Sequence, residues 1–198
     1  MRRVLVTAFE PFGGESINPS EEVLKVITSS RVDLIKCYLP TTYQDIEELI
    51  RKEIAEKKPD DVIMLGQAGG RKGISLERFA INIDDAALAD NRGEIRDGLQ
   101  IIADGMDAYR SNLPLHALKM RLINAGIPAH VSNHAGSFVC NHLSYIVLHE
   151  IFTKDLKMRA GFIHIPYLHA QVLTKDSVFS MSLDEMAKAI EIILDGLD

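Results

Sequence analysis

Cys140 is one of two cysteines in this chain, and its position favours a reactive thiol. Residues 127–151 alternate as a strand does, break at Ala135-Gly136-Ser137, and then repeat apolar residues at helical spacing. This pattern places Cys140 near the N-terminus of a predicted helix, where the helix dipole and unpaired N–H groups favour a negative charge such as a thiolate. A small buried core residue is the other interpretation, because Cys140 shares a stripe with Leu143 and Val147.

Two further ionisable residues fall on predicted strands. His164 lies near the end of an apolar strand over 160–167, and Glu77 shares one face of an extended segment over 74–84 with large apolar residues. A thiol, an imidazole and a half-buried carboxylate form a nucleophile, base and orienter set for attack on a carbonyl. Considered one at a time, His164 and Glu77 can each be explained by a structural role instead of a catalytic one. His164 is then a core imidazole bonded to backbone, and Glu77 is a surface ion partner of Arg78.

Alternating strand and helix patterns surround these residues and indicate a parallel sheet with right-handed crossovers. Ligands bind beyond the C-terminal ends of the strands in such sheets, which is where Cys140 and His164 are expected. Residues 85–112 show no clear period, so they form a functional flap or hold short elements. Strands are predicted over 4–9, 33–39, 61–66, 74–84, 129–131 and 160–167, and helices from 19, over 43–57, 114–125 and 140–151, and beyond a capping box at Ser182 and Glu185.

The composition is that of a globular protein, with 198 residues, 46% of them apolar, 25% charged, and a net charge of −6. We expect a single domain over residues 1–198. No basic patch and no membrane-length apolar run occurs in the sequence, so neither nucleic acid nor a membrane is expected as a partner. Cys37 and Cys140 make no disulfide framework, which favours a reducing, cytoplasmic setting.

A glycine-rich loop over 66–73 suggests phosphate binding, and a nucleoside phosphorylase-like transferase is therefore an alternative function. The offsets of a Walker loop fail here, because Arg71, Lys72 and Gly73 stand where Gly-Lys-Ser/Thr is required. The dinucleotide-binding spacing fails as well. Several histidines, among them His130 and His134, suggest a metal site, but no ligand motif accompanies them. We therefore expect neither a metal nor another cofactor.

Long stretches spread over nearly the whole chain match one known family. They are residues 9–14 with 18–20, 66–71 leading into 74–82, 132–141, and 161–167. On these residues the chain resembles the pyroglutamyl peptidase I family, also called the pyrrolidone-carboxylate peptidases.

The resemblance implies a thiol peptidase that removes an N-terminal pyroglutamate (5-oxoproline) from peptides through an acyl-enzyme. By motif position, Cys140 is the nucleophile, His164 the base and acid, and Glu77 the orienter. The resemblance further implies an α/β/α sandwich around a twisted, mostly parallel sheet, and a homotetramer. The residues expected around the lactam ring are Phe9, Phe12 and Phe138, with Val139 and Gln67 alongside.

Two positions depart from the family's pattern. The family commonly carries an arginine where this chain has Ala87, and Arg71, Arg92 and Arg96 are candidates to replace it. His134 stands where family members usually carry a smaller residue. The missing arginine raises a third possibility, a relative that binds pyroglutamyl groups but turns them over slowly.

Overall fold

The computed structural model describes residues 1–197. Its central element is a seven-stranded sheet formed by β1 (Arg2–Phe9), β2 (Val32–Leu39), β3 (Asp61–Gln67), β4 (Ile74–Ile81), β7 (Ala108–Arg110), β8 (Ala129–His134) and β9 (Arg159–Ile165). The strand order is β2-β1-β3-β9-β4-β7, and β8 also pairs with β4. β1, β2, β3 and β9 run parallel, as do β4 and β8, whereas β4 runs antiparallel to β9 and β7. The prediction of a mostly parallel sheet is confirmed.

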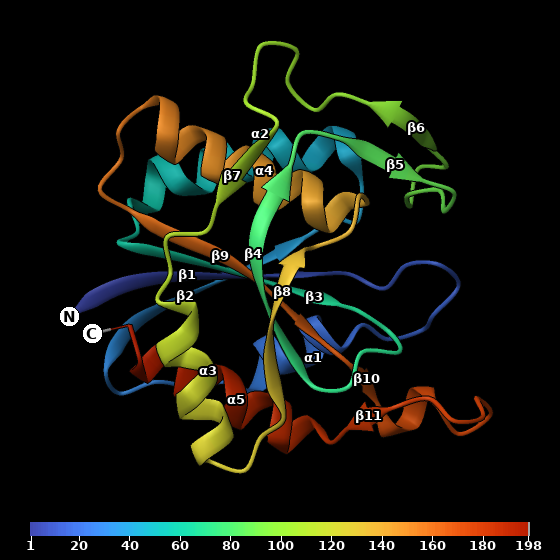
Figure 1. The fold of residues 1–198 in the computed structure, drawn as a ribbon. Coiled ribbons are helices and arrows are strands. Elements are labelled where there is room, and N and C mark those ends of the chain that lie inside the picture. The colour runs from blue at the N-terminus through green and yellow to red at the C-terminus, as the bar shows by residue number, and fades with distance from the viewer. Residues whose placement is uncertain (198) are drawn as a thin grey trace.

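Helices cover both faces of this sheet and make it the middle of an α/β/α sandwich (Figure 1). Apolar side chains of α1, α3 and α5 pack on one face, and those of α2 and α4 pack on the other. The helices are α1 (Pro19–Val26), α2 (Tyr43–Lys57), α3 (Leu115–Asn124), α4 (Val139–Thr153) and α5 (Leu183–Asp195), with a short 3-10 helix η1 (His169–Gln171). No helix within residues 1–197 is long and apolar enough to cross a membrane.

The predicted helix starts are confirmed by their caps. The Asn18 side chain accepts a hydrogen bond from the Ser20 N–H at 3.0 Å, and Pro19 opens α1. Ser182 and Glu185 form the expected capping box at the start of α5. Side-chain oxygens at these positions bond the N–H groups that the first helical turn leaves unpaired.

Two predicted strands are shorter than the sequence pattern suggested. β4 ends at Ile81, because the side chain of Asn82 bonds the backbone of residues 101–105 instead of continuing the sheet. β9 ends at Ile165, and after Pro166 a separate short strand, β10 (Tyr167–Leu168), pairs with β11 (Ser180–Met181). Proline has no N–H to donate to a ladder, which accounts for the break.

The stretch of residues 85–112 holds short elements. β5 (Asp84–Ala86) and β6 (Arg96–Leu99) pair as an antiparallel hairpin, and β7 extends the main sheet beyond β4. Figure 1 shows the β5–β6 hairpin standing away from the main sheet, on the side of α2 and α4. Asn91 ties it down by donating to Glu10 Oε1 at 2.8 Å and to the Pro11 carbonyl at 2.9 Å.

Candidate active site

Three parallel strands end at one edge of the sheet, and the candidate residues lie around those ends. β1, β3 and β9 finish at Phe9, Gln67 and Ile165. β4 runs in the opposite direction beside β9, with Ser75 opposite His164. Glu77, two residues further along β4, therefore points to the same side of the sheet as His164.

The carboxylate of Glu77 and the imidazole of His164 are in direct contact. Glu77 Oε1 lies 2.8 Å from His164 Nδ1, and the two residues are only 2% and 3% exposed. With Nδ1–H donated to the carboxylate, Nε2 is left to exchange a proton. Burial lowers the pKa of His164, although its hydrogen bond to Glu77 acts in the opposite direction. The imidazole is therefore neutral at neutral pH, with Nε2 able to accept a proton.

The alternative pairing of Glu77 with Arg78 is wrong. Arg78 instead donates to Asn133 Oδ1 at 3.1 Å, on an exposed part of the surface. Neighbouring residues of a strand point to opposite faces of the sheet, so Glu77 and Arg78 face away from each other.

Cys140 lies in the first turn of α4, over the end of β3. A Cβ built on Gly66 would lie 3.0 Å from the Cys140 sulfur and 2.7 Å from the ring of Phe162. Gly66 is opposite His164 in the sheet register, and the rings of Phe162 and His164 are 4.7 Å apart. The thiol and the imidazole thus share one small region. Among the residues that the structure describes, no hydrogen bond joins the Cys140 thiol to the His164 imidazole. A hydrogen bond between a nucleophile and its base often forms only when a substrate is bound.

The environment of Cys140 disfavours a free thiolate. Burial, reinforced by the charge of Glu77, raises the pKa of the thiol to about 12. The start of α4 opposes this effect, because Phe138 caps the helix without a side-chain bond and the first backbone bond runs from the His142 N–H to the Phe138 carbonyl. The N–H groups of Val139, Cys140 and Asn141 therefore have no partner along the helix. The thiol needs a base beside it to react at neutral pH.

Aromatic rings form a wall next to the thiol. The rings of Phe12 and Phe138 are 5.8 Å apart and half-buried, and Tyr43 meets Phe138 edge-on at 5.7 Å. Phe9 lies deeper, 1% exposed, with its ring 6.4 Å from that of Phe162. Of the expected lining residues, Phe12 and Phe138 are accessible to a ligand. Phe9 and the fully buried Val139 back them.

Gln67 lies at the end of β3, and a second glutamine fixes its orientation. Gln171 Nε2, in η1, donates to Gln67 Oε1 at 2.9 Å and to the Ile17 carbonyl at 3.3 Å. Gln171 Oε1 in turn accepts from the Leu168 N–H at 3.0 Å. The Gln67 oxygen thus has a partner within the protein, and its NH2 group carries two N–H donors. No sequence pattern points to Gln171, because its partner is 104 residues away.

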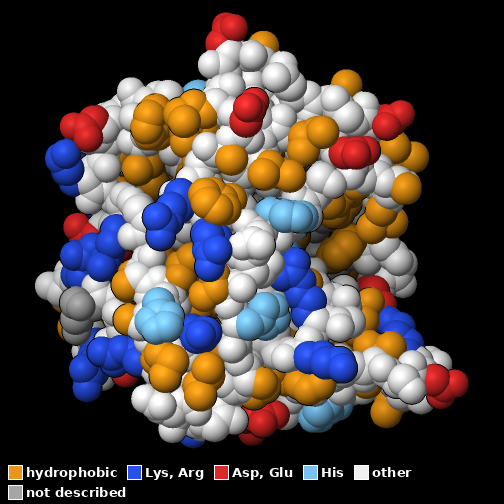
Figure 2. All heavy atoms as spheres, viewed as in Figure 1, with side chains coloured by type: hydrophobic (Ala, Val, Ile, Leu, Met, Phe, Trp, Pro, Cys, Tyr) orange, Lys and Arg blue, Asp and Glu red, His pale blue; other side chains and the backbone are white. Residues whose placement is uncertain are grey.

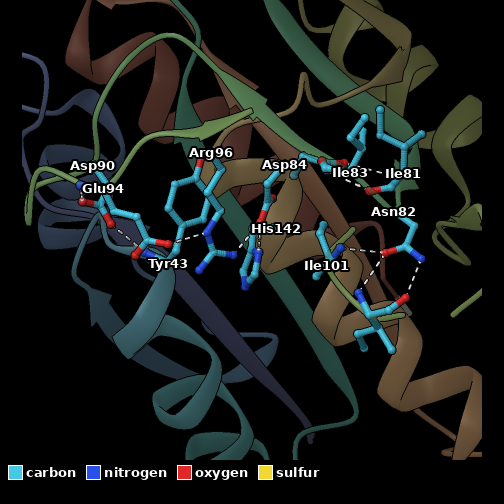
Figure 3. Close-up of polar contacts among 12 residues, drawn as sticks. Tyr43, Ile81, Asn82, Ile83, Asp84, Asp90, Glu94, Arg96, Ile101 and His142 are labelled. Atoms are coloured by element: carbon cyan, nitrogen blue, oxygen red, sulfur yellow. Dashed lines mark hydrogen bonds and ion pairs between the residues drawn. The ribbon is translucent and has the colours of Figure 1, made fainter. Parts of the chain in front are cut away.

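A cluster of buried charges holds the β5–β6 hairpin against α4. Asp84 Oδ2 lies 2.8 Å from His142 Nδ1 and 2.7 Å from Arg96, whose guanidinium also stacks over the Tyr43 ring at 4.2 Å. Figure 3 shows these side chains in one row, from Glu94 through Arg96 to Asp84 and His142. The row connects the hairpin to α4 through His142, two residues after Cys140, and to the aromatic wall through Tyr43.

The three arginines proposed for the missing family position have different surroundings. Arg96 is committed to the hairpin cluster, and Arg92 pairs with Asp45 on the surface, where its side chain is 55% exposed. Arg71 donates to Glu77 Oε1 at 2.5 Å. Arg71 is therefore the one of the three that contacts the Glu77–His164 pair, and Ala87 itself is exposed.

The glycine-rich loop leading to Arg71 is explained by packing. A Cβ on Gly66 would meet Phe162, and one on Gly69 would lie 2.2 Å from the Tyr167 ring. These glycines allow close approach of neighbouring side chains, and the loop's arginine turns inward to a carboxylate. The arrangement differs from a phosphate cradle, in which N–H groups and a cation face the ligand.

The histidines suspected as metal ligands have other partners or face solvent. His130 Nε2 bonds Ser75 at 3.1 Å, His149 bonds Tyr109 at 2.9 Å, and His134 is exposed, with Nδ1 accepting from the Gly136 N–H. Among residues 1–197, no group of three histidine, cysteine or acidic side chains could hold a metal ion.

Comparison with known proteins gives matches along nearly the whole chain. The family model described as Pyroglutamyl peptidase matches residues 2–196. A pyrrolidone-carboxylate peptidase of Clostridium perfringens is 46% identical over 197 residues, covering 98% of this chain and 92% of that protein. Pyrrolidone-carboxylate peptidase 2 of Caldanaerobacter subterraneus is 50% identical over 192 residues, covering 96% and 93%.

Solved structures give the same result at the level of the fold. The crystal structure of pyroglutamyl peptidase I from Bacillus amyloliquefaciens superposes with a TM-score of 0.94 at 40% identity, covering 99% of this chain and 94% of that one. That of the pyrrolidone carboxyl peptidase from Fervidobacterium islandicum gives a TM-score of 0.96 at 37% identity, covering 100% and 98%.

Proposed function

The chain belongs to the pyroglutamyl peptidase family, and from this membership and the geometry of the site we propose that Cys140, His164 and Glu77 carry out its reaction. The protein is a cysteine peptidase that removes N-terminal pyroglutamate from peptides. This membership decides against the phosphorylase-like transferase. The observation that carries the proposed triad is the buried 2.8 Å contact between Glu77 and His164, beside a thiol at the start of a helix.

In the first half of the proposed reaction, His164 Nε2 takes the proton of the Cys140 thiol as the sulfur attacks the pyroglutamyl carbonyl carbon. The new carbon–sulfur bond moves the carbonyl π electrons onto oxygen, and the free N–H groups at the start of α4 stabilise the oxyanion. Glu77 keeps the imidazole in the required tautomer and stabilises its cation. Because the thiol's pKa is raised to about 12, this proton transfer to His164 is what makes the nucleophile at neutral pH.

In the second half, the oxyanion collapses and the carbon–nitrogen bond breaks. The imidazolium of His164 gives its proton to the departing amine of the shortened peptide, which leaves a thioester on Cys140. A water molecule then attacks the thioester carbonyl while His164 takes its proton. The carbon–sulfur bond breaks, the imidazolium of His164 returns its proton to the departing thiolate, and pyroglutamate is released with a free carboxyl group.

The proposed binding pocket suits a neutral ring. Pyroglutamate has no free amine, so its recognition requires apolar walls and a few directed hydrogen bonds. Phe12 and Phe138 supply the walls, and the oriented amide of Gln67 supplies a donor for the lactam carbonyl. A peptide with an ordinary, charged N-terminus has no carboxylate partner in this set of residues and is excluded.

A fluorogenic pyroglutamyl amide tests the assignment. We expect Cys140→Ser to lower kcat/KM by on the order of 10,000-fold or more, as for other nucleophile deletions. Cys37→Ser is the matched control, because Cys37 is the other buried free cysteine and lies on β2. Iodoacetamide should abolish activity and EDTA should leave it unchanged. Turnover that survives Cys140→Ser would refute the triad, and tight pyroglutamate binding without turnover in the unmodified protein would identify a slow binding relative.

We also propose a reducing, cytoplasmic setting and a homotetramer. The two unpaired, buried cysteines support the first. The exposed side chains of Phe79, Met106 and Phe152, which gather beside β7, support a surface that further copies bury. Figure 2 shows hydrophobic side chains over the upper half of this face and Lys and Arg below them. Light scattering on the purified protein tests the assembly, and a monomer mass would exclude it.

A further inference from the structure

One oxygen of Glu77 receives two donors, while the other receives none. Arg71 Nη1 lies 2.5 Å and His164 Nδ1 lies 2.8 Å from Glu77 Oε1. Glu77 Oε2 is buried and has no hydrogen-bond partner among residues 1–197. The orientation of the carboxylate is thus set by two convergent bonds to a single atom, and one of them comes from an arginine outside the triad.

The loop between β3 and β4 brings Arg71 to this position. Arg71 N–H donates to the Ala68 carbonyl at 3.4 Å in a turn, and Gly69 packs against Tyr167. Arg71 Nη2 also reaches the carbonyl of His134, on β8, at 3.5 Å. The guanidinium is therefore held at both ends, and its side chain is 27% exposed, between Glu77 and solvent.

We propose that Arg71 is a positioning residue for the reaction, which fixes the Glu77 carboxylate under His164 and balances its buried negative charge. This inference rests on the triad proposed above. Arg71 acts through Glu77, and no bond breaks or forms at its own atoms.

The balance of charge gives the physical reason. Glu77 is almost fully buried, and a buried carboxylate that loses its cation either takes a proton or leaves the site. Arg71 compensates Glu77 both before and after the proton passes from Cys140 to His164. Its positive charge also lowers the pKa of the thiol and of the imidazole, opposing the effect of Glu77 on each.

The groups that face the reacting pair come from several elements. Glu77 of β4 and Arg71 of the preceding loop act on it by charge. His134 of β8 contributes its backbone carbonyl, and Tyr167 of β10 packs against the loop at Gly69. The ring of His142, on α4 after Cys140, bonds Asp84 of the hairpin cluster instead.

Three variants test the role, with kcat and KM measured on a fluorogenic pyroglutamyl amide across pH. We expect Arg71→Met to lower kcat roughly 10- to 100-fold, the size of effect that a slightly misplaced catalytic group produces, with little change in KM. The kcat/KM profile should shift to higher pH, because the charge that lowered both pKa values is gone. Arg71→Lys should restore the position of the profile. Arg78→Met removes the half-buried arginine that follows Glu77 in the sequence and bonds Asn133, and it should change neither kcat nor the pH profile.

Alkylation of Cys140 by iodoacetamide gives a second readout that needs no turnover. In the intact chain carrying Arg71→Met, the rise of the alkylation rate with pH should also move upward, and circular dichroism reports whether the variant is folded. If Arg71→Met is unfolded, the same measurements on Arg71→Gln and Arg71→Lys decide the question.

The outcomes separate this inference from the assignment on which it rests. Unshifted profiles for turnover and alkylation in folded Arg71→Met, together with inactive Cys140→Ser, overturn the role of Arg71 alone. A rise in KM with unchanged kcat and profile also overturns it, because Arg71 would then be a substrate contact. Activity that survives Cys140→Ser overturns the triad itself.

Discussion

Replacing Glu77 by glutamine tests how the carboxylate of the proposed triad works, because a glutamine can keep its hydrogen bonds while losing its charge. Both donors, His164 Nδ1 and Arg71 Nη1, converge on Oε1. A glutamine that places its carbonyl oxygen at that point accepts both bonds and keeps the imidazole tautomer. Its NH2 group then occupies the place of Oε2, which has no partner among residues 1–197. Glu77→Gln is therefore expected to remove the charge and keep the geometry.

The magnitude follows from the strength of the two kinds of bond. A hydrogen bond to a charged group contributes about 1.5–3 kcal/mol and one between neutral groups about 0.5–1.5 kcal/mol, a difference of about 1–2 kcal/mol. With a tenfold change in rate for about 1.36 kcal/mol, kcat should fall roughly 5- to 30-fold. Glu77→Leu removes the acceptor altogether. Its loss should approach the roughly 10,000-fold that a wrong imidazole tautomer costs in a serine protease triad.

The assay compares kcat and KM of both variants on a fluorogenic pyroglutamyl amide. Glu150→Gln is the matched control, because Glu150 is also buried and paired with an arginine, Arg51, but lies near the far end of α4. A loss in Glu77→Gln as large as that in Glu77→Leu would refute the reasoning, since it would show that the amide turns its NH2 toward His164. A change confined to KM would assign Glu77 to substrate binding.

The hairpin cluster, Gly66 and His164 are each tested by one substitution. Arg96→Met leaves the buried carboxylate of Asp84 without its cation, so the free energy of unfolding should fall by about 3 kcal/mol and KM should rise more than kcat falls. Thermal unfolding and hydrogen exchange over the hairpin measure this, and an unchanged KM would contradict the hairpin's role in the pocket. Gly66→Ala introduces a Cβ 3.0 Å from the Cys140 sulfur, and displacing the thiol should cost roughly 100-fold in kcat. His164→Ala removes the base beside the Cys140 thiol, whose pKa is raised to about 12 by burial. At pH ~8 this thiol should therefore react with iodoacetamide more slowly than in the unmodified protein, and its rate should recover as the pH rises. Equal rates for the two proteins at that pH would show that Cys140 ionises without His164.

Much of the fold follows from local sequence signals. α2 was predicted with the bounds it has, Tyr43–Lys57, and the caps at Asn18 and Ser182 lie where side-chain chemistry placed them. These signals are local, because a cap needs only the next two or three residues and an apolar stripe only its own helix. The short strands within residues 84–110 carry no such signal, because three or four residues are too few to show a period.

The partners at the site were harder to predict, because they join residues far apart in the sequence. The Glu77–His164 contact spans 87 residues and the Gln171–Gln67 contact 104. One alternative can be excluded from the sequence alone. Glu77 and Arg78 are neighbours on a strand, and the alternation of side chains excludes their pairing across one face. No comparable signal pointed to Arg71, because its reach to Glu77 depends on how the glycine-rich loop turns.

The direction of β4 explains how these residues meet. His164 lies near the C-terminal end of β9, at the edge where the parallel strands β1, β3 and β9 finish. β4 runs the other way, so its early residues Ser75 and Glu77 lie beside the end of β9, and the loop before it delivers Arg71 to the same place. A parallel β4 would put those early residues at the opposite edge of the sheet, about 20 Å away for a strand of this length. The antiparallel pairing of β4 and β9 is thus the feature that gathers carboxylate, imidazole and guanidinium under the thiol of α4.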